Sequence, residues 1–213
     1  MCNNATCLGY LLLVILLGFS ILIYFLLRNR KKFLAENLQL IPDQVYKTVS
    51  QRAGLLGFSK SHLIYGIYQD KTMTIKQVVV KDFNGDEIGS IENYLGVRKT
   101  DIIIGNERHQ IEYPLTWRKS ALLKNAKGEL LATYERLPFS LRKHKFIIPN
   151  IGTIISQSPP FDFRYPFNYE LNGKVIGITQ QVATRVVGSI VLFPVAYPLN
   201  IKIFILAINA TGI

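Results

Sequence analysis

Hydrophobic and polar positions follow three patterns along the chain, and each pattern predicts a different structure. Residues 8–27 are twenty consecutive uncharged residues rich in Leu, Ile and Phe. Residues 33–57 carry apolar positions at helical spacing, with Val49 and Ala53 near one face. From residue 62 onward, short apolar runs alternate with turn residues. We therefore predict a long apolar helix, a helical stalk and a β-rich domain.

The segment 8–27 has the length of a transmembrane helix. At ~1.5 Å per residue it spans roughly 30 Å, the thickness of a bilayer's hydrocarbon core. Tyr10 and Tyr24 lie near its ends, where amphipathic rings favour the membrane interface. A cleaved signal peptide would need a basic start and a small-residue cleavage site, but here the start is uncharged and a basic cluster follows. The sequence predicts a single-pass membrane anchor.

The basic cluster predicts the orientation of this anchor, because flanking basic residues are retained on the cytoplasmic side. We expect residues 1–7 to form a short non-cytoplasmic N-terminus, 8–27 the transmembrane helix, 28–61 a basic juxtamembrane segment and helical stalk, and 62–213 a cytoplasmic β-rich domain. The membrane-flanking basic residues are Arg28, Arg30, Lys31 and Lys32.

Residues 186–208 are also apolar, but a second span is disfavoured. They contain two prolines and Lys202, and a central Lys costs roughly 2.5–3.5 kcal/mol on insertion. Both cysteines, Cys2 and Cys7, precede the first apolar segment, so the β-rich domain has neither a disulfide nor a thiolate metal site. Interfacial thiols, lipidation and an intermolecular disulfide all remain open for this pair.

Residues 62–213 are expected to form an antiparallel β-barrel or sandwich built of hairpins. Gly85, Gly128 and Gly173 each stand between an incoming and an outgoing apolar run, and their spacings of 43 and 45 residues favour a repeated hairpin unit. The nearly uncharged segment 199–208 must be buried, as a central strand or as a helix. The first eight expected strands are residues 63–68, 73–83, 87–92, 101–104, 110–115, 120–124, 130–136 and 146–148.

Four motifs in this domain resemble the tubby C-terminal-like superfamily, which includes LURP-one-related proteins and phospholipid scramblases. They are the D-x-N-G turn at 82–85, the run RKSALLKNAKGELL at 118–131, the turn NGKVIG at 172–177 and the apolar segment 201–208. The resemblance covers roughly residues 62–213 and implies a closed barrel with an apolar C-terminal helix through its centre. For some members it implies binding of lipids or phosphoinositides. The N-terminal anchor and the missing acidic calcium-binding run depart from scramblases, and no family binding residue maps onto a numbered position.

The charge balance favours an anionic partner. The chain has 25 Lys and Arg against 14 Asp and Glu, a net charge of +11. We expect one basic loop, held near the bilayer by the anchor, to contact anionic phospholipid headgroups; a merely solvated loop is the alternative. Nucleic acid is disfavoured because no groove-binding helix or single-strand motif is present. The basic residues of this expected site are Arg136, Arg142, Lys143 and Lys145.

Catalytic and metal-binding signatures are absent from the sequence. The three histidines are scattered, and there is no nucleophile elbow, P-loop or dinucleotide-binding fingerprint. His109, among carboxylates, is expected to be exposed or salt-bridged. We therefore expect a non-enzymatic binding module without cofactor or metal. The alternative is a structural or assembly protein whose β domain binds other proteins.

Overall fold

The structure is a computed structural model that describes residues 17, 18, 20, 42–70, 75–94, 96–115, 119–137, 143–158, 167–181 and 189–211. The chain divides into two compact units, Met1–Gln39 and Leu40–Ile213. Apart from residues 17, 18 and 20, the expected transmembrane segment 8–27 lies outside the described residues. Within the described parts of the chain, no helix has the length and apolar character needed to cross a membrane.

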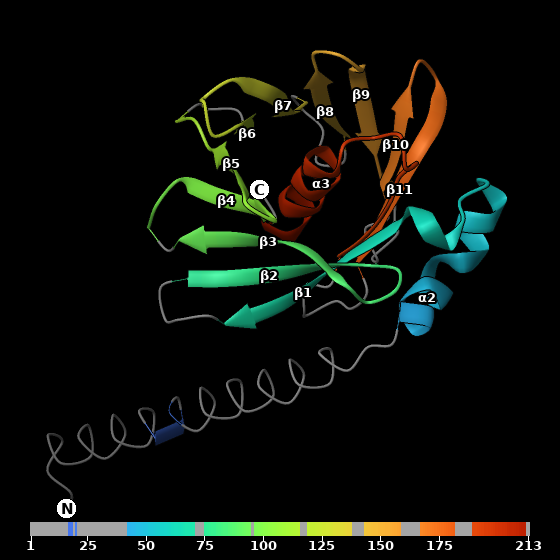
Figure 1. Ribbon diagram of the computed structural model, residues 1–213, viewed down its shortest axis with the longest axis horizontal. Coiled ribbons are helices and arrows are strands. Elements are labelled where there is room, and N and C mark those ends of the chain that lie inside the picture. Colours follow the sequence, from blue (N-terminus) through green and yellow to red (C-terminus); the bar gives the residue numbers. More distant parts are fainter. Residues whose placement is uncertain are drawn as a thin grey trace, which may run out of the picture. The chain divides into compact units, whose positions relative to one another are not determined.

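The unit Leu40–Ile213 contains a closed antiparallel barrel formed by the twelve strands that the structure describes (Figure 1). Each strand pairs with the next along the chain, and β1 closes the barrel against β12. Closure leaves no unpaired strand edge. The strands are β1 (Leu63–Asp70), β2 (Ile75–Asp82), β3 (Glu87–Tyr94), β4 (Lys99–Ile104), β5 (Glu107–Glu112), β6 (Ser120–Lys124), β7 (Leu130–Arg136), β8 (Lys143–Ile148), β9 (Gly152–Gln157), β10 (Phe167–Leu171), β11 (Lys174–Gln181) and β12 (Ser189–Leu192).

The expected strands and hairpins are confirmed, and the largest boundary errors are at both ends of β5 and at the start of β8, which was expected at residue 146 and lies at Lys143. The sequence predicted a strand over 110–115, whereas β5 begins at Glu107. Gly105 has a φ of 56° and ends β4 in a tight turn, a conformation that glycine adopts without steric cost. The three repeated turn glycines, Gly85, Gly128 and Gly173, also have positive φ values, of 89°, 82° and 76°.

The helix α3 (Leu199–Thr211) lies inside the ring of strands in Figure 1 and fills the barrel. Its residues 203–207 have no exposed surface, and Phe204 packs edge-on against Phe146 of β8. A helix that is apolar on all sides is stable only when it is buried on all sides. The expectation that 199–208 is buried is confirmed, and the helical alternative is the one observed. Lys202 is 7% exposed, and burial lowers the pKa of its amine.

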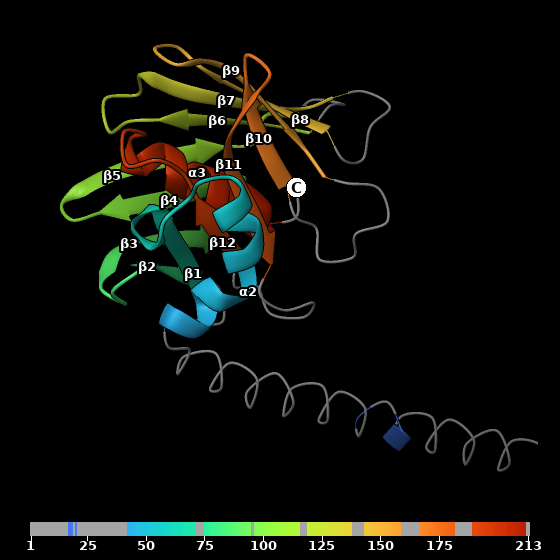
Figure 2. The ribbon, with the colours of Figure 1, turned by 90° about the vertical axis from the view of Figure 1, so that its right-hand side faces the viewer.

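The helix α2 (Pro42–Leu55) packs on the outside of the barrel (Figure 2). Val49 and Ala53 are buried against outward side chains of β1, β11 and β12, forming a second apolar cluster with Phe58. The 3-10 turn η1 (Lys60–His62) then leads into β1. The helix expected after Pro42 is confirmed, while residues 33–41 of the expected stalk lie outside the described residues.

Gly66 on β1 should tolerate no larger side chain, because α3 approaches the wall there. A Cβ at this position would lie 2.7 Å from Val78 Cγ1 and 3.0 Å from Leu206 Cδ2, and both side chains are fully buried. We expect Gly66→Ala to lower the free energy of unfolding by about 1–3 kcal/mol through overpacking.

Gly54→Ala is the control, because a Cβ at this exposed position of α2 meets nothing within 4 Å. It should raise stability by up to about 1 kcal/mol through helix propensity. Urea unfolding followed by circular dichroism measures both variants. Equal stability of the two would contradict the close packing of α3 against β1.

Candidate functional site

The barrel has two chemically different ends. Because each strand runs antiparallel to the next, alternate connections lie at the same end. The connections that follow β1, β3, β5, β7, β9 and β11 lie at one end, here called the long-connection end. Those that follow β2, β4, β6, β8 and β10 lie at the opposite end, here called the turn end.

Charged side chains are divided unequally between these ends. We compare the described residues of the strand connections and the strand residues that border them. At the long-connection end these are the basic residues Arg98, Lys99, Lys119, Arg136 and Lys143 and the acidic residues Asp70 and Glu112. At the turn end they are the acidic residues Asp82, Asp86, Glu87, Glu107 and Glu129 and the basic residues Lys124, Lys127 and Lys174. Such a distribution draws anions toward the long-connection end.

The expected headgroup-binding residues that the structure describes belong to this end but do not share one face. The expectation that they lie in a loop is wrong for these three, because Arg136 ends β7 and Lys143 and Lys145 belong to β8. Strand pairing sets Arg136 opposite His144 and Lys145 opposite Glu135, so Arg136 and Lys145 point to opposite faces of the wall. Lys145 is half-buried, and Lys143 is exposed at the start of β8. The remaining expected site residues lie outside the described residues: Arg142, Arg28, Arg30, Lys31 and Lys32.

A second basic group at this end was not expected from the sequence. The backbone N–H of Tyr113 donates a hydrogen bond of 3.1 Å to the carbonyl of Arg98, which joins the β3–β4 and β5–β6 connections. Two open hollows of about 320 and 360 Å³ adjoin this junction and share Val97, Arg98, Lys99 and Tyr113 in their walls. We call this pair of hollows the Arg98/Lys99 hollow.

The electrostatics of the Arg98/Lys99 hollow favour an anion. Glu112 lines one side and accepts a hydrogen bond of 2.6 Å from Lys124. This bond is the main cause that lowers the pKa of Glu112, and Lys99 lowers it further. Because Lys124 already balances Glu112, the exposed Arg98 and Lys99 leave the rim with a net positive charge.

Neutral polar groups line the other side of the hollow. The Thr100 hydroxyl donates a hydrogen bond to the amide oxygen of Asn93 and lies 3.1 Å from the Tyr113 hydroxyl. All three residues lie in the wall of the smaller hollow. Because Thr100 already donates its one hydroxyl proton to Asn93, the groups that this hollow offers to a phosphate are the guanidinium of Arg98 and the ammonium of Lys99.

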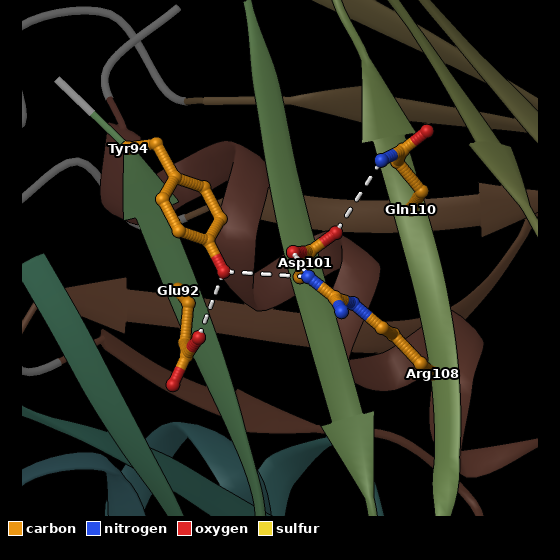
Figure 3. Close-up of polar contacts among 5 residues, drawn as sticks. All are labelled: Glu92, Tyr94, Asp101, Arg108 and Gln110. Carbon is orange, nitrogen blue, oxygen red and sulfur yellow. Dashed lines mark hydrogen bonds and ion pairs between the residues drawn. The ribbon is translucent and has the colours of Figure 1, made fainter. Parts of the chain in front are cut away.

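A polar cluster on the outer wall fixes the strands that carry this hollow. Glu92 on β3 lies directly opposite Asp101 on β4, and both are buried. In Figure 3 the Tyr94 hydroxyl points toward Glu92, and Arg108 and Gln110 reach Asp101 from β5. Tyr94 donates a hydrogen bond of 3.0 Å to Glu92. Burial, and then its bonds to both carboxylates, raises the pKa of Tyr94 to about 12, so it remains a donor at neutral pH.

His109 differs in part from its expected environment. Its side chain points to the inner face of the wall, opposite Ile102, and the residue is 6% exposed; the expectation of exposure is therefore wrong. Its Nε2 lies 3.5 Å from a Glu107 carboxylate oxygen, a separation that forms an ion pair only when the imidazole is protonated, and neither ring nitrogen has a hydrogen-bond partner among the described residues. In the parts of the chain that the structure describes, no three His, Cys, Asp or Glu residues are grouped as a metal site.

Comparison with known proteins provides no relative whose binding site could be set beside this one. No family model, curated protein or solved structure matches the chain. The resemblance to the tubby C-terminal-like superfamily therefore stays a prediction from sequence motifs.

Replacing Arg108 should destabilise the barrel, because a buried carboxylate then loses its ion-pair partner. Arg108→Ala leaves Asp101, whose side chain is 3% exposed, without its ion-pair partner. We expect a loss of about 1–3 kcal/mol in the free energy of unfolding. Adding Asp101→Asn should restore part of it, because the uncompensated charge is then gone. Additive effects in this double-mutant cycle, measured by urea unfolding, would contradict the coupling.

His144 should make the barrel less stable in acid. It is half-buried, stacks on Tyr134 and bonds the Tyr134 hydroxyl at 2.7 Å. Burial, and then the charge of Arg136, lowers its pKa from 6.5 to about 4. Between these pH values the unfolded chain binds more protons than the folded chain, so stability falls as the pH falls from 6.5 to 4.

We expect this contribution to be about 1–2 kcal/mol after allowance for solvent screening. His144→Phe keeps a ring for stacking and should remove that part of the pH dependence. Urea unfolding at pH 7 and pH 4.5 compares the two proteins. An identical pH dependence in both would show that His144 titrates as it does in the unfolded chain.

Proposed function

We propose that the barrel is a non-enzymatic binding module that recognises anionic phospholipid headgroups at its long-connection end. The observation that carries the proposal is the separation of charge along the barrel, which gathers basic residues at one end and carboxylates at the other. Arg and Lys bind phosphate through charge-assisted hydrogen bonds. Near an anionic leaflet each contributes about 1 kcal/mol, so several together give selective binding.

The sequence of the N-terminal unit supports the same proposal. Residues 8–27 and the basic residues that follow them predict an integral, single-pass membrane protein with a cytoplasmic C-terminal domain. Such an anchor would keep the barrel beside the anionic cytoplasmic leaflet, where even weak headgroup contacts become effective. The resemblance to the tubby C-terminal-like superfamily carries the same expectation of lipid binding.

The binding site we propose combines the expected basic loop with the Arg98/Lys99 hollow. In the expected loop, Lys143 is exposed and Lys145 shares its face of β8. The hollow adds a concave surface beside Arg98 and Lys99, which a single loop lacks. We therefore expect the hollow to contribute more affinity than the β7–β8 connection.

A structural role in protein assembly is the second candidate. Leu55 is 83% exposed and Leu56 is 36% exposed, next to each other where α2 ends. Adjacent exposed leucines favour a protein contact. This alternative also predicts an exposed apolar patch near residues 161–167, which lie outside the described residues except for Phe167.

Charge-reversal variants distinguish vesicle binding through this site from general attraction by the net charge of the domain. We expect residues 33–213, which contain the whole compact unit Leu40–Ile213, to sediment with anionic vesicles and not with neutral ones, with binding that weakens as salt rises. Arg98→Glu with Lys99→Glu should weaken this binding about tenfold or more. A smaller loss is expected for the combined variant Arg142→Glu, Lys143→Glu and Lys145→Glu.

The matched control is Lys127→Glu with Lys174→Glu, which changes the net charge equally at exposed positions of the turn end. It should leave vesicle binding nearly unchanged. Equal losses of vesicle binding in the control and in the Arg98/Lys99 variant would show that binding depends only on the net charge. Wild-type protein that shows no preference for anionic vesicles would contradict the proposed function itself.

A further inference from the structure

Two exposed apolar side chains stand at the long-connection end, next to its basic residues. Val97 in the β3–β4 connection is 54% exposed, and Leu115 in the β5–β6 connection is 81% exposed. Arg98 and Lys99 follow Val97 directly, and Lys119 lies in the same connection as Leu115. At the turn end, the exposed Leu130 instead follows Glu129 directly, and the exposed Val195 lies in the β12–α3 connection, whose described residues 193–198 include no basic residue.

The two connections act as one structural unit. The β3–β4 connection leads into β4 and the β5–β6 connection follows β5, the strand that pairs with β4. The hydrogen bond from Tyr113 to Arg98 ties the two connections together. Val97 and Pro114, the neighbour of Leu115, line the same hollow with Tyr113. Apolar side chains, a tyrosine ring and basic groups are therefore held together at one tip of the barrel.

We propose that the described residues 96–98 of the β3–β4 connection and 113–115 and 119 of the β5–β6 connection form, with Lys99, a membrane-docking tip. In it, Val97 and Leu115 enter the interfacial layer of an anionic bilayer while Arg98, Lys99 and Lys119 contact lipid phosphates. This inference rests on the proposed function. It adds the residues that insert and the way the barrel meets the membrane, with its long-connection end toward the lipid.

The combination of side chains selects a bilayer over other anionic partners. A soluble phosphate compound would satisfy the basic groups but would leave Val97 and Leu115 in water. A bilayer interface accepts both, since apolar side chains enter the acyl boundary and basic and tyrosine side chains remain at headgroup level. Insertion of apolar surface also resists salt, so part of the binding should persist when the basic groups are screened.

A fluorophore at the tip tests this inference on the full chain. Cys2→Ser and Cys7→Ser remove the native thiols, and Leu115→Cys accepts a polarity-sensitive dye. The chain is placed with phosphatidylcholine vesicles that contain or lack phosphatidylserine, a readout that works whether or not the chain is anchored. The control carries the same dye at Lys127→Cys, an exposed position of the turn end.

We expect a blue shift at position 115 only with phosphatidylserine, and quenching of the dye by lipids brominated in their acyl chains. Position 127 should show neither. In a chain labelled at Val97→Cys, Leu115→Asp should reduce quenching about threefold or more, because a charged group at the tip opposes insertion. Leu130→Asp, which changes an exposed apolar residue of the turn end, should not alter it.

The outcomes that would overturn the inference differ from those that would overturn the proposed function. If the barrel binds anionic vesicles through charge while the dye at position 115 remains unquenched, the proposed function stands and the docking tip is contradicted. An equal blue shift with soluble polyglutamate in place of vesicles would make the tip a protein-binding face. No response to phosphatidylserine at position 115, together with no preference in sedimentation, would remove both proposals.

Discussion

The burial of α3 is the constraint on which the rest of this structure depends. A thirteen-residue helix with apolar residues on all its faces has no side suited to water. A closed barrel surrounds such a helix completely, and its inward side chains form one cluster with residues 201–208. At Gly66 and Gly89 of the wall, a side chain would collide with the neighbouring strand and would also crowd Leu206 and Ile203 of α3. Helix and barrel therefore require each other.

This arrangement determines where binding chemistry can be placed. The barrel interior is occupied by α3, and part of the outer wall is covered by α2. The connections between strands carry the remaining variable surface, and antiparallel pairing sorts them into two ends. Basic residues that are distant in sequence, such as Arg98 and Lys119, are gathered at one end by the topology. The proposed lipid recognition follows from that sorting of charge.

The sequence predicted the fold well where local patterns determine it. Alternating apolar runs and turn glycines located the first eight strands, since pleat periodicity and positive φ are local properties. Segment 199–208 could be recognised as buried but not as helical. A nearly uninterrupted apolar run shows neither the helical nor the strand alternation of polar and apolar positions. The start of β5 was misplaced because its first four residues, 107–110, are polar and show no apolar run, although they form the outgoing strand of the turn at Gly105.

The candidate site was less predictable because strand pairing creates it. Arg98 and Lys99 are only two adjacent basic residues in the sequence, and the hollow beside them forms when β3, β4 and β5 align. The cluster of Glu92, Asp101 and Arg108 likewise joins three strands. In the expected basic loop, the alternation of faces already places Arg136 and Lys145 apart once β7 and β8 are aligned. Charge runs therefore indicated the same end of the barrel as the proposed site but not the concave surface there.

Hydrogen exchange of the α3 backbone tests the central claim most directly. If α3 fills the barrel, the amides of residues 201–208 can exchange only when the barrel opens. We predict that they belong to the slowest-exchanging set of the full chain, and that their exchange free energy equals the free energy of global unfolding. Exchange of these amides as fast as that of the exposed turns would show that α3 leaves the barrel easily, and would contradict the account.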